Sequence, residues 1–138
     1  DDIGAQYMNG MFGTSATSPE GEASDLFAQA YEAEFGELPP LPYIDSAYDA
    51  AMIMALAIEQ AGSTDGPAIR DAIREVANAP GEKIYPGELA KALDIIRGGG
   101  DVDYVGASAV ELIGPGESAG TYRMIEVQDG QNVTIGFK

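Results

Sequence analysis

Apolar residues between Pro19 and Gly36 recur at the spacing of one helix face. They are Ala23, Leu26, Phe27, Ala30, Tyr31 and Phe35. Ser18 suits an N-cap, Pro19 suits a first helical turn, and Gly36 suits the position just after a helix. The pattern predicts an amphipathic helix that begins at Pro19 and ends before Gly36.

The segment from Tyr48 to Ala61 is apolar nearly all round and is followed by Gly62. The run Pro39-Pro40-Leu41-Pro42 before it cannot be helical, because proline lacks an N–H and restricts the residue that precedes it. We therefore predict an extended loop, and then a helix that Asp45 or Ser46 caps. A helix with so few polar positions must be buried on most of its faces.

Two further helices follow the same logic. Asp65-Gly66-Pro67 predicts the start of a third helix, and Pro86 predicts the start of a fourth, which Gly98 to Gly100 end. The third carries an apolar stripe of Ile69, Ile73 and Val76, and the fourth carries Leu89, Ala92, Leu93 and Ile96.

Strand patterns lie toward the two ends of the chain. Ile3 to Thr14 mixes apolar residues with glycines, which indicates a strand or extended crossover, and Asp103 to Ser108 predicts a short buried strand. Thr121 to Gln128 and Gln131 to Phe137 alternate around Asp129-Gly130, a strong signal for a type I′ hairpin.

These elements predict an α/β organisation in three parts. Residues 1–14 form a strand or crossover, residues 15–100 form a helical part, and residues 101–138 form the last strands, with a turn at Gly114-Pro115-Gly116. Four helices with so few strands cannot close a doubly wound sheet. We expect them to pack on strands that lie elsewhere, so that the chain is part of a larger protein.

Composition and charge narrow the possible partners. Apolar residues make up 45% of the 138 residues, but no run approaches the roughly 18 that cross a membrane. No signal peptide is visible, so we expect a secreted protein whose signal lies outside these residues, or a cytosolic one. The net charge is −16, and residues 1–69 contain no Lys or Arg, which argues against nucleic acid and anionic lipid as partners. The surplus of carboxylates is interpreted as an aid to solubility, such as adaptation to a salty medium.

The sequence contains neither Cys nor His. Cysteine nucleophiles, histidine bases, zinc sites and disulfides are therefore excluded, and we predict no catalytic residue, metal or cofactor. Three short motifs are interpreted as structural: the glycines from Gly98 to Gly100, the acids around Asp101, and the sequon Asn132-Val133-Thr134, which falls inside a predicted strand.

The loop that leads into the second helix has more suggestive chemistry. It delivers Tyr43, Ile44 and Asp45 to a helix N-terminus, where free N–H groups attract a carboxylate and an aromatic ring can cover an apolar group. An amino acid or similar small acid would suit such a site. The alternative is that Tyr43 packs on the loop and Asp45 is only an N-cap.

An ordered series of segments resembles the C-terminal half of solute-binding proteins of the branched-chain amino-acid type. The segments are Phe27 to Gly36, Pro39-Pro40, Ala47 to Ala51, Ala57 to Ser63, Ala68 to Arg74, Pro86 to Glu88, Asp103 to Ser108 and Gly120 to Tyr122. Relatives often follow the Gly-Ala-Ser strand with a different turn, where this chain has Ala109-Val110-Glu111-Leu112-Ile113.

The resemblance implies a type I periplasmic-binding-protein fold, in which two Rossmann-like lobes joined by three crossovers close on a ligand. This chain would supply helices of the N-terminal lobe, crossovers and a C-terminal hairpin, while the missing N-terminal part of the same protein would supply most of the cleft. The implied partners are a small amino-acid-like ligand and an ABC permease in the inner membrane, with the binding protein in the periplasm.

The resemblance also suggests site residues. It makes Tyr43 an aromatic ligand contact, with Asp45 and Ser46 beside it. It places a crossover near Gly10, Gly13 and Thr14, where glycines suit a hinge.

Two alternative functions remain at this point. The same fold could serve as the ligand-sensing domain of a receptor or regulator. A carboxylate-based hydrolase would instead need two acids that converge in one cleft, which the sequence does not indicate.

Overall fold

The computed structural model describes residue 4 and residues 7–138. The chain divides into two compact units. The first, here called the sheet unit, combines the residues up to Ser18 with those from Gly120 onward; the second, the helical unit, runs from Pro19 to Ala119.

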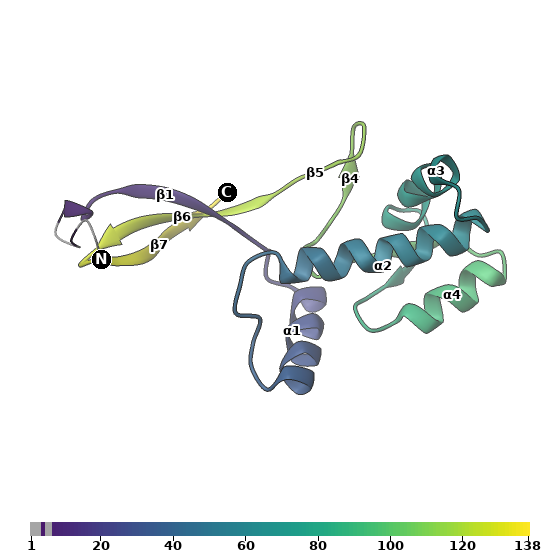
Figure 1. Cartoon of the computed structure of the whole chain (residues 1–138), viewed down its shortest axis with the longest axis horizontal. Coiled ribbons are helices and arrows are strands. Elements are labelled where there is room, and N and C mark those ends of the chain that lie inside the picture. The colour runs from purple at the N-terminus through teal and green to yellow at the C-terminus, as the bar shows by residue number, and fades with distance from the viewer. Residues whose placement is uncertain (1–3, 5–6) are drawn as a thin grey trace. The chain divides into compact units, whose positions relative to one another are not determined.

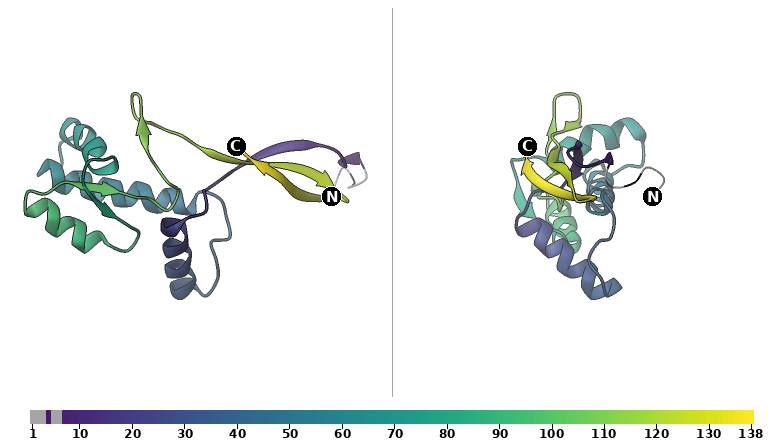
Figure 2. Two further views of the ribbon diagram at one scale, coloured as in Figure 1. Left: turned by 180° about the vertical axis from the view of Figure 1, so that it is seen from behind. Right: turned by 90° about the vertical axis from the view of Figure 1, so that its left-hand side faces the viewer.

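The sheet unit contains a three-stranded antiparallel sheet. Its strands are β1 (Phe12–Thr17), β6 (Thr121–Gln128) and β7 (Gln131–Phe137), in the order β1-β6-β7. Asp129 and Gly130 have φ angles of 51° and 76°, and a type I′ turn requires positive φ at both positions. The predicted hairpin is confirmed with its predicted bounds. Figure 1 and the left view of Figure 2 show the three strands side by side.

The first strand and the first helix differ from their predicted bounds. The stretch predicted from Ile3 to Thr14 lies partly outside the described residues. β1 continues to Thr17, so the chain is still extended where a Ser18 cap would require it to turn. The helix α1 (Glu22–Phe35) therefore begins three residues later than predicted, and its predicted end at Gly36 is confirmed, with φ at 77°.

The core of the helical unit forms where three helices pack with a short parallel sheet. The helices are α2 (Ile44–Ala61), α3 (Gly66–Ala77) and α4 (Leu89–Arg97), and the strands are β2 (Glu82–Ile84) and β3 (Val102–Tyr104). The sequence did not predict β2, because three residues of which two are charged give no strand pattern. The fully covered members of this core include Leu56, Val76, Ile84, Val102 and Tyr104.

Helix α2 is buried on one side only. Met52, Ile53 and Leu56 face the core, whereas Met54 is 45% exposed and Ile58 is 36% exposed. The prediction of a helix buried on most faces is therefore wrong for this structure, because no element of the helical unit covers the opposite face. No helix within the described part of the chain combines the length and the apolar character that crossing a membrane requires.

The remaining bounds follow from local turns. The third helix begins after Asp65, as predicted. The fourth begins at Leu89 and not at Pro86, because residues 85–88 form a turn in which the Glu88 N–H donates to the Tyr85 carbonyl at 3.0 Å. The predicted turn at Gly114 to Gly116 joins two short strands that were not predicted, β4 (Leu112–Ile113) and β5 (Glu117–Ser118).

Candidate functional site

The start of α2 is formed by a residue in an uncommon conformation. Tyr43 occupies the N-cap with φ at 69° and ψ at 4°, in the left-handed region. Its carbonyl accepts the first helical hydrogen bond, from the Ala47 N–H at 2.9 Å. The side chain is 62% exposed. A bulky residue costs about 1–2 kcal/mol in this region, and burial of the Tyr43 ring does not offset that cost within the helical unit.

Asp45 and Ser46 lie inside the first turn of α2, so the prediction that one of them is the N-cap is wrong. The helix begins earlier because the chain already turns at Tyr43. Asp45 Oδ1 accepts the Ser46 N–H at 2.7 Å and lies 3.5 Å from the Ser46 hydroxyl oxygen. A carboxylate in the first turn is favourable to the helix dipole. It also places negative charge where an anionic ligand group was expected.

Structure and sequence agree that Tyr43, Asp45 and Ser46 are neighbours on one helix start. The three predicted hinge residues belong to the sheet unit. Gly10 ends a turn with φ at 80°, and its N–H donates to the Val127 carbonyl at 2.9 Å. Gly13 and Thr14 are paired within β1, opposite residues 125 and 124 of β6. Their role as hinges stays a prediction.

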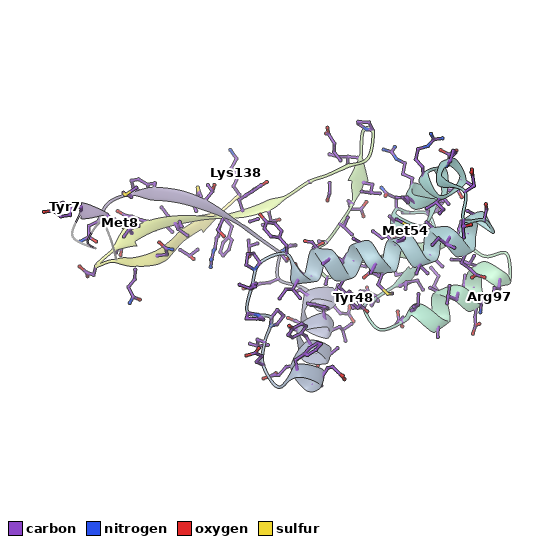
Figure 3. The ribbon with its side chains drawn as sticks, viewed as in Figure 1. Tyr7, Met8, Tyr48, Met54, Arg97 and Lys138 are labelled. Atoms are coloured by element: carbon purple, nitrogen blue, oxygen red, sulfur yellow. The ribbon has the colours of Figure 1, made fainter. Side chains whose placement is uncertain are left out.

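An aromatic cluster lies one turn further along α2. The ring of Tyr48 is 5.1 Å from that of Phe27 on α1, and its hydroxyl accepts the Gly87 N–H at 2.9 Å. Figure 3 shows Tyr48 on the part of α2 next to α1. A cavity of about 280 Å³ lies beside this cluster. Its lining consists of Phe27, Ala30, Tyr31, Phe35, Ile44, Tyr48, Pro86 and Gly87.

Asp49 is the functional residue that the sequence analysis missed. Its carboxylate is 1% exposed and accepts four hydrogen bonds. The donors are the Tyr104 hydroxyl at 2.8 Å, the Ala107 N–H at 2.9 Å, and the Ser108 N–H and hydroxyl at 2.8 and 2.6 Å. The available signal was that Asp49 is the one acid in the apolar run from Tyr48 to Ile58, since such a carboxylate must be hydrogen-bonded when it is buried.

The Asp49 carboxylate organises the turn that follows β3. Ala109 has φ at 53°, and its N–H donates to the Gly106 carbonyl at 2.9 Å. Gly106 has no room for a side chain, because an added Cβ would lie 2.5 Å from Asp49 Oδ2. Burial and the charge of Asp49 together raise the pKa of Tyr104 far above its usual value, so that Tyr104 remains a donor.

Two basic residues of the helical unit form ion pairs with acids outside the first turn of α2. The Arg97 guanidinium pairs with Glu59 at 2.8 Å, and the Lys91 ammonium pairs with Glu82 at 3.0 Å. Figure 3 shows Arg97 on α4, toward the other end of α2. No group of three or more potential metal ligands occurs among residues 4 and 7–138. The arrangement at the start of α2 can offer a ring face, a carboxylate and a hydroxyl to a ligand.

Comparison with known proteins gives a consistent assignment. The sequence model of a family described as periplasmic binding protein matches residues 1–89. The chain is 29% identical over 115 residues to the chemotactic signal transduction system substrate-binding protein BasB of Halobacterium salinarum, a match that covers 82% of this chain and 28% of BasB. Its fold is similar to that of the leucine binding protein LivK from Thermotoga maritima, with a TM-score of 0.60, 21% identity, and coverage of 99% of this chain and 33% of LivK. The chain thus spans a third or less of the length of these two proteins.

Proposed function

Since this chain belongs to the periplasmic binding protein family, we propose that it is part of a solute-binding protein that captures a small amino-acid-like ligand without transforming it. The family and the α/β fold predicted from the sequence are confirmed. The ligand would be held between the two lobes of the complete fold. Ligand contacts that form only in the closed state would then shift the protein toward closure.

The observation that carries this proposal is the conformation of Tyr43. Tyr43 is strained in the left-handed region, and its 62% exposed side chain gains little burial to offset that strain. Residues of this kind cluster at binding sites, where the strain positions a side chain in advance of the ligand. We therefore assign to Tyr43 the role of a wall against which the apolar part of the ligand packs.

Asp45 and Ser46 would bind the polar part of the same ligand. The Asp45 carboxylate attracts a positively charged group, and an amino acid offers its ammonium. The Ser46 hydroxyl can accept from the same ammonium or donate to a carbonyl oxygen.

Two uses of a captured ligand are proposed, in order of preference. The first is delivery to an ABC permease in the inner membrane, with the binding protein in the periplasm. The second is presentation of the ligand to a signalling partner, which the similarity to BasB favours because that relative is named as part of a chemotactic signal transduction system. Both uses require the same binding step.

Thermal unfolding in the presence of candidate ligands tests the binding step. The protein, purified as its host makes it, would be scanned with leucine, isoleucine, valine, phenylalanine and short amides. A ligand at 100 times its Kd should stabilise the fold by about 2.7 kcal/mol. Absence of a shift with every amino acid and amide would contradict the proposed function.

A pair of variants tests the role of Tyr43. Tyr43→Ala should weaken binding of the identified amino acid at least tenfold while leaving the fold intact. Phe35→Ala serves as a matched control, because Phe35 is an aromatic residue with a similar exposure of 64%. Equal affinity of the two variants would show that Tyr43 does not contact the ligand.

A separate experiment distinguishes delivery from signalling. Uptake of the radiolabelled amino acid and the swimming response to it would both be measured in a deletion strain.

A further inference from the structure

We propose that Asn132 is an N-glycosylation site. Asn132-Val133-Thr134 is the only Asn-x-Ser/Thr sequence in the chain, because Asn9 and Asn78 are followed two positions later by Met and Pro. The tripeptide alone is a weak signal, and its position in a strand led to a structural interpretation above. The structure supplies the evidence that the sequence lacked.

The sequon lies on an edge strand with both of its functional side chains accessible. β7 is the outer strand in the order β1-β6-β7. Asn132 is opposite Val127 and Thr134 is opposite Ile125, so the two side chains point to the same face of the sheet. Asn132 and Thr134 are both exposed. Among the residues that the structure describes, none hydrogen-bonds the Asn132 carboxamide.

The strand register also shows which residues share each face of the sheet. Phe12 and Val133 are both opposite Glu126, so they share the face that does not carry Asn132. That face exposes large apolar side chains: Phe12 at 72%, Tyr122 at 47%, Met124 at 37% and Val133 at 37%. The face with Asn132 carries the polar Ser15 and Arg123 together with the apolar Ile125, Val127 and Phe137. The exposure of Asn132 and Thr134 leaves room on this face for a bulky, hydrophilic glycan.

The reaction needs a glycosyl donor and a transferase outside the cytoplasm, so the inference rests on the proposed extracytoplasmic location. The donor is a saccharide linked through its anomeric carbon to a polyprenyl phosphate or pyrophosphate. The Asn132 carboxamide nitrogen forms a bond to that carbon, the bond from carbon to phosphate oxygen breaks, and the lipid phosphate leaves with the electron pair. The amide proton passes to a base of the transferase. If the saccharide is transferred before the protein folds, the later pairing of Asn132 within the sheet does not block the reaction.

Mass spectrometry of the protein from its own host tests the inference. The peptide that contains Asn132 should carry one or more hexose-type units, and Asn132→Gln and Thr134→Ala should each abolish that added mass. Thr134→Ser keeps the sequon and should retain it, while Asn9→Gln should have no effect. Unaltered melting temperatures would show that the two exposed substitutions leave the fold intact.

The outcomes also separate this inference from the proposed function. An unmodified Asn132 in protein recovered from outside the cytoplasm would overturn the glycosylation site alone. An unmodified Asn132 in protein confined to the cytoplasm would overturn both the site and the proposed location. Added mass that persists in Asn132→Gln would show that another residue is modified and would also contradict the proposal.

Discussion

Asp49 and Ser108 are joined by two hydrogen bonds to the same carboxylate oxygen, one from the Ser108 hydroxyl at 2.6 Å and one from its N–H at 2.8 Å. The pair connects the second turn of α2 to the segment after β3, although the two residues are 59 positions apart in sequence. Within the part of the chain that the structure describes, Asp49 forms hydrogen bonds but no ion pair, so hydrogen bonds stabilise its charge there. Such a group tolerates few substitutions.

Asp49→Asn should destabilise the protein by about 2–4 kcal/mol. An amide has only one acceptor oxygen, and its NH₂ group would face the N–H donor of either residue 107 or residue 108. Ser108→Ala removes one donor and leaves the charge, so it should cost about 1 kcal/mol. Urea unfolding of the two variants and the wild type would measure both losses. Equal losses of unfolding free energy in the two variants would show that the charge of Asp49 does not stabilise the loop.

Alkaline pH should destabilise the protein through Tyr104. Burial and the charge of Asp49 raise the pKa of Tyr104 above its usual 10.0, so the folded state keeps the hydroxyl neutral while the unfolded state ionises it. The stabilising contribution is complete below pH 10.0 and is lost as the pH rises above that value.

Unfolding midpoints in urea between pH 8 and pH 11 would measure this loss. Tyr104→Phe should be less stable than the wild type at pH 8, and the difference should shrink toward pH 11. Tyr122 is 47% exposed, so Tyr122→Phe is the control. Its unfolding midpoint should change with pH in the same way as that of the wild type. A difference for Tyr104→Phe that stays constant over this range would contradict the assignment.

Tyr43→Gly should stabilise the fold while it weakens ligand binding. Glycine relieves about 1–2 kcal/mol of left-handed strain and loses about 0.5–1 kcal/mol through greater freedom of the unfolded chain. The net gain is about 0.5–1 kcal/mol, because an exposed ring contributes little packing. Chemical unfolding and calorimetric titration with the identified amino acid would measure the two effects. A loss of stability would show that the Tyr43 ring packs more than its exposure indicates.

Salt should stabilise this protein over a wide range of concentration. Its 23 acidic and 7 basic residues give a net charge of −16, and repulsion within the folded state is screened as the Debye length falls from about 30 Å at 0.01 M to about 3 Å at 1 M. The melting temperature should therefore rise with sodium chloride. Glu32→Gln with Glu34→Gln, on exposed positions of α1, should reduce the slope. A melting temperature that is flat or falls with salt would refute this explanation.

Local signals account for the elements that were predicted correctly. The hairpin at Asp129-Gly130 needs only two residues with positive φ between alternating strands. The ends of α1 and α2 need only Gly36 and Gly62, which adopt the left-handed conformation as expected. Each of these features is decided within a few residues, and the ordered family resemblance then fixed the fold class.

Helix starts were predicted less well, because they depend on what the preceding segment does. Pro19 could not begin α1 while β1 was still paired through Thr17, and that pairing involves Thr121. Asp45 could not cap α2 once the chain turned at Tyr43. The exposed face of α2 was also not predicted. Apolar composition indicates which side chains can be buried, but it does not indicate which element packs against them.

The sequence by itself determined the hairpin, the helix ends, the family and the segment that contains Tyr43, because these follow from local backbone preferences and from residue types in a fixed order. Only the tertiary structure decided that Tyr43 is strained, that Asp49 holds the loop at Ser108, and that Asn132 and Thr134 lie exposed on the same face of an edge strand. Those three facts depend on contacts or strand register between distant residues, or on a backbone angle unusual for the residue type. A pattern read along one chain does not contain that information.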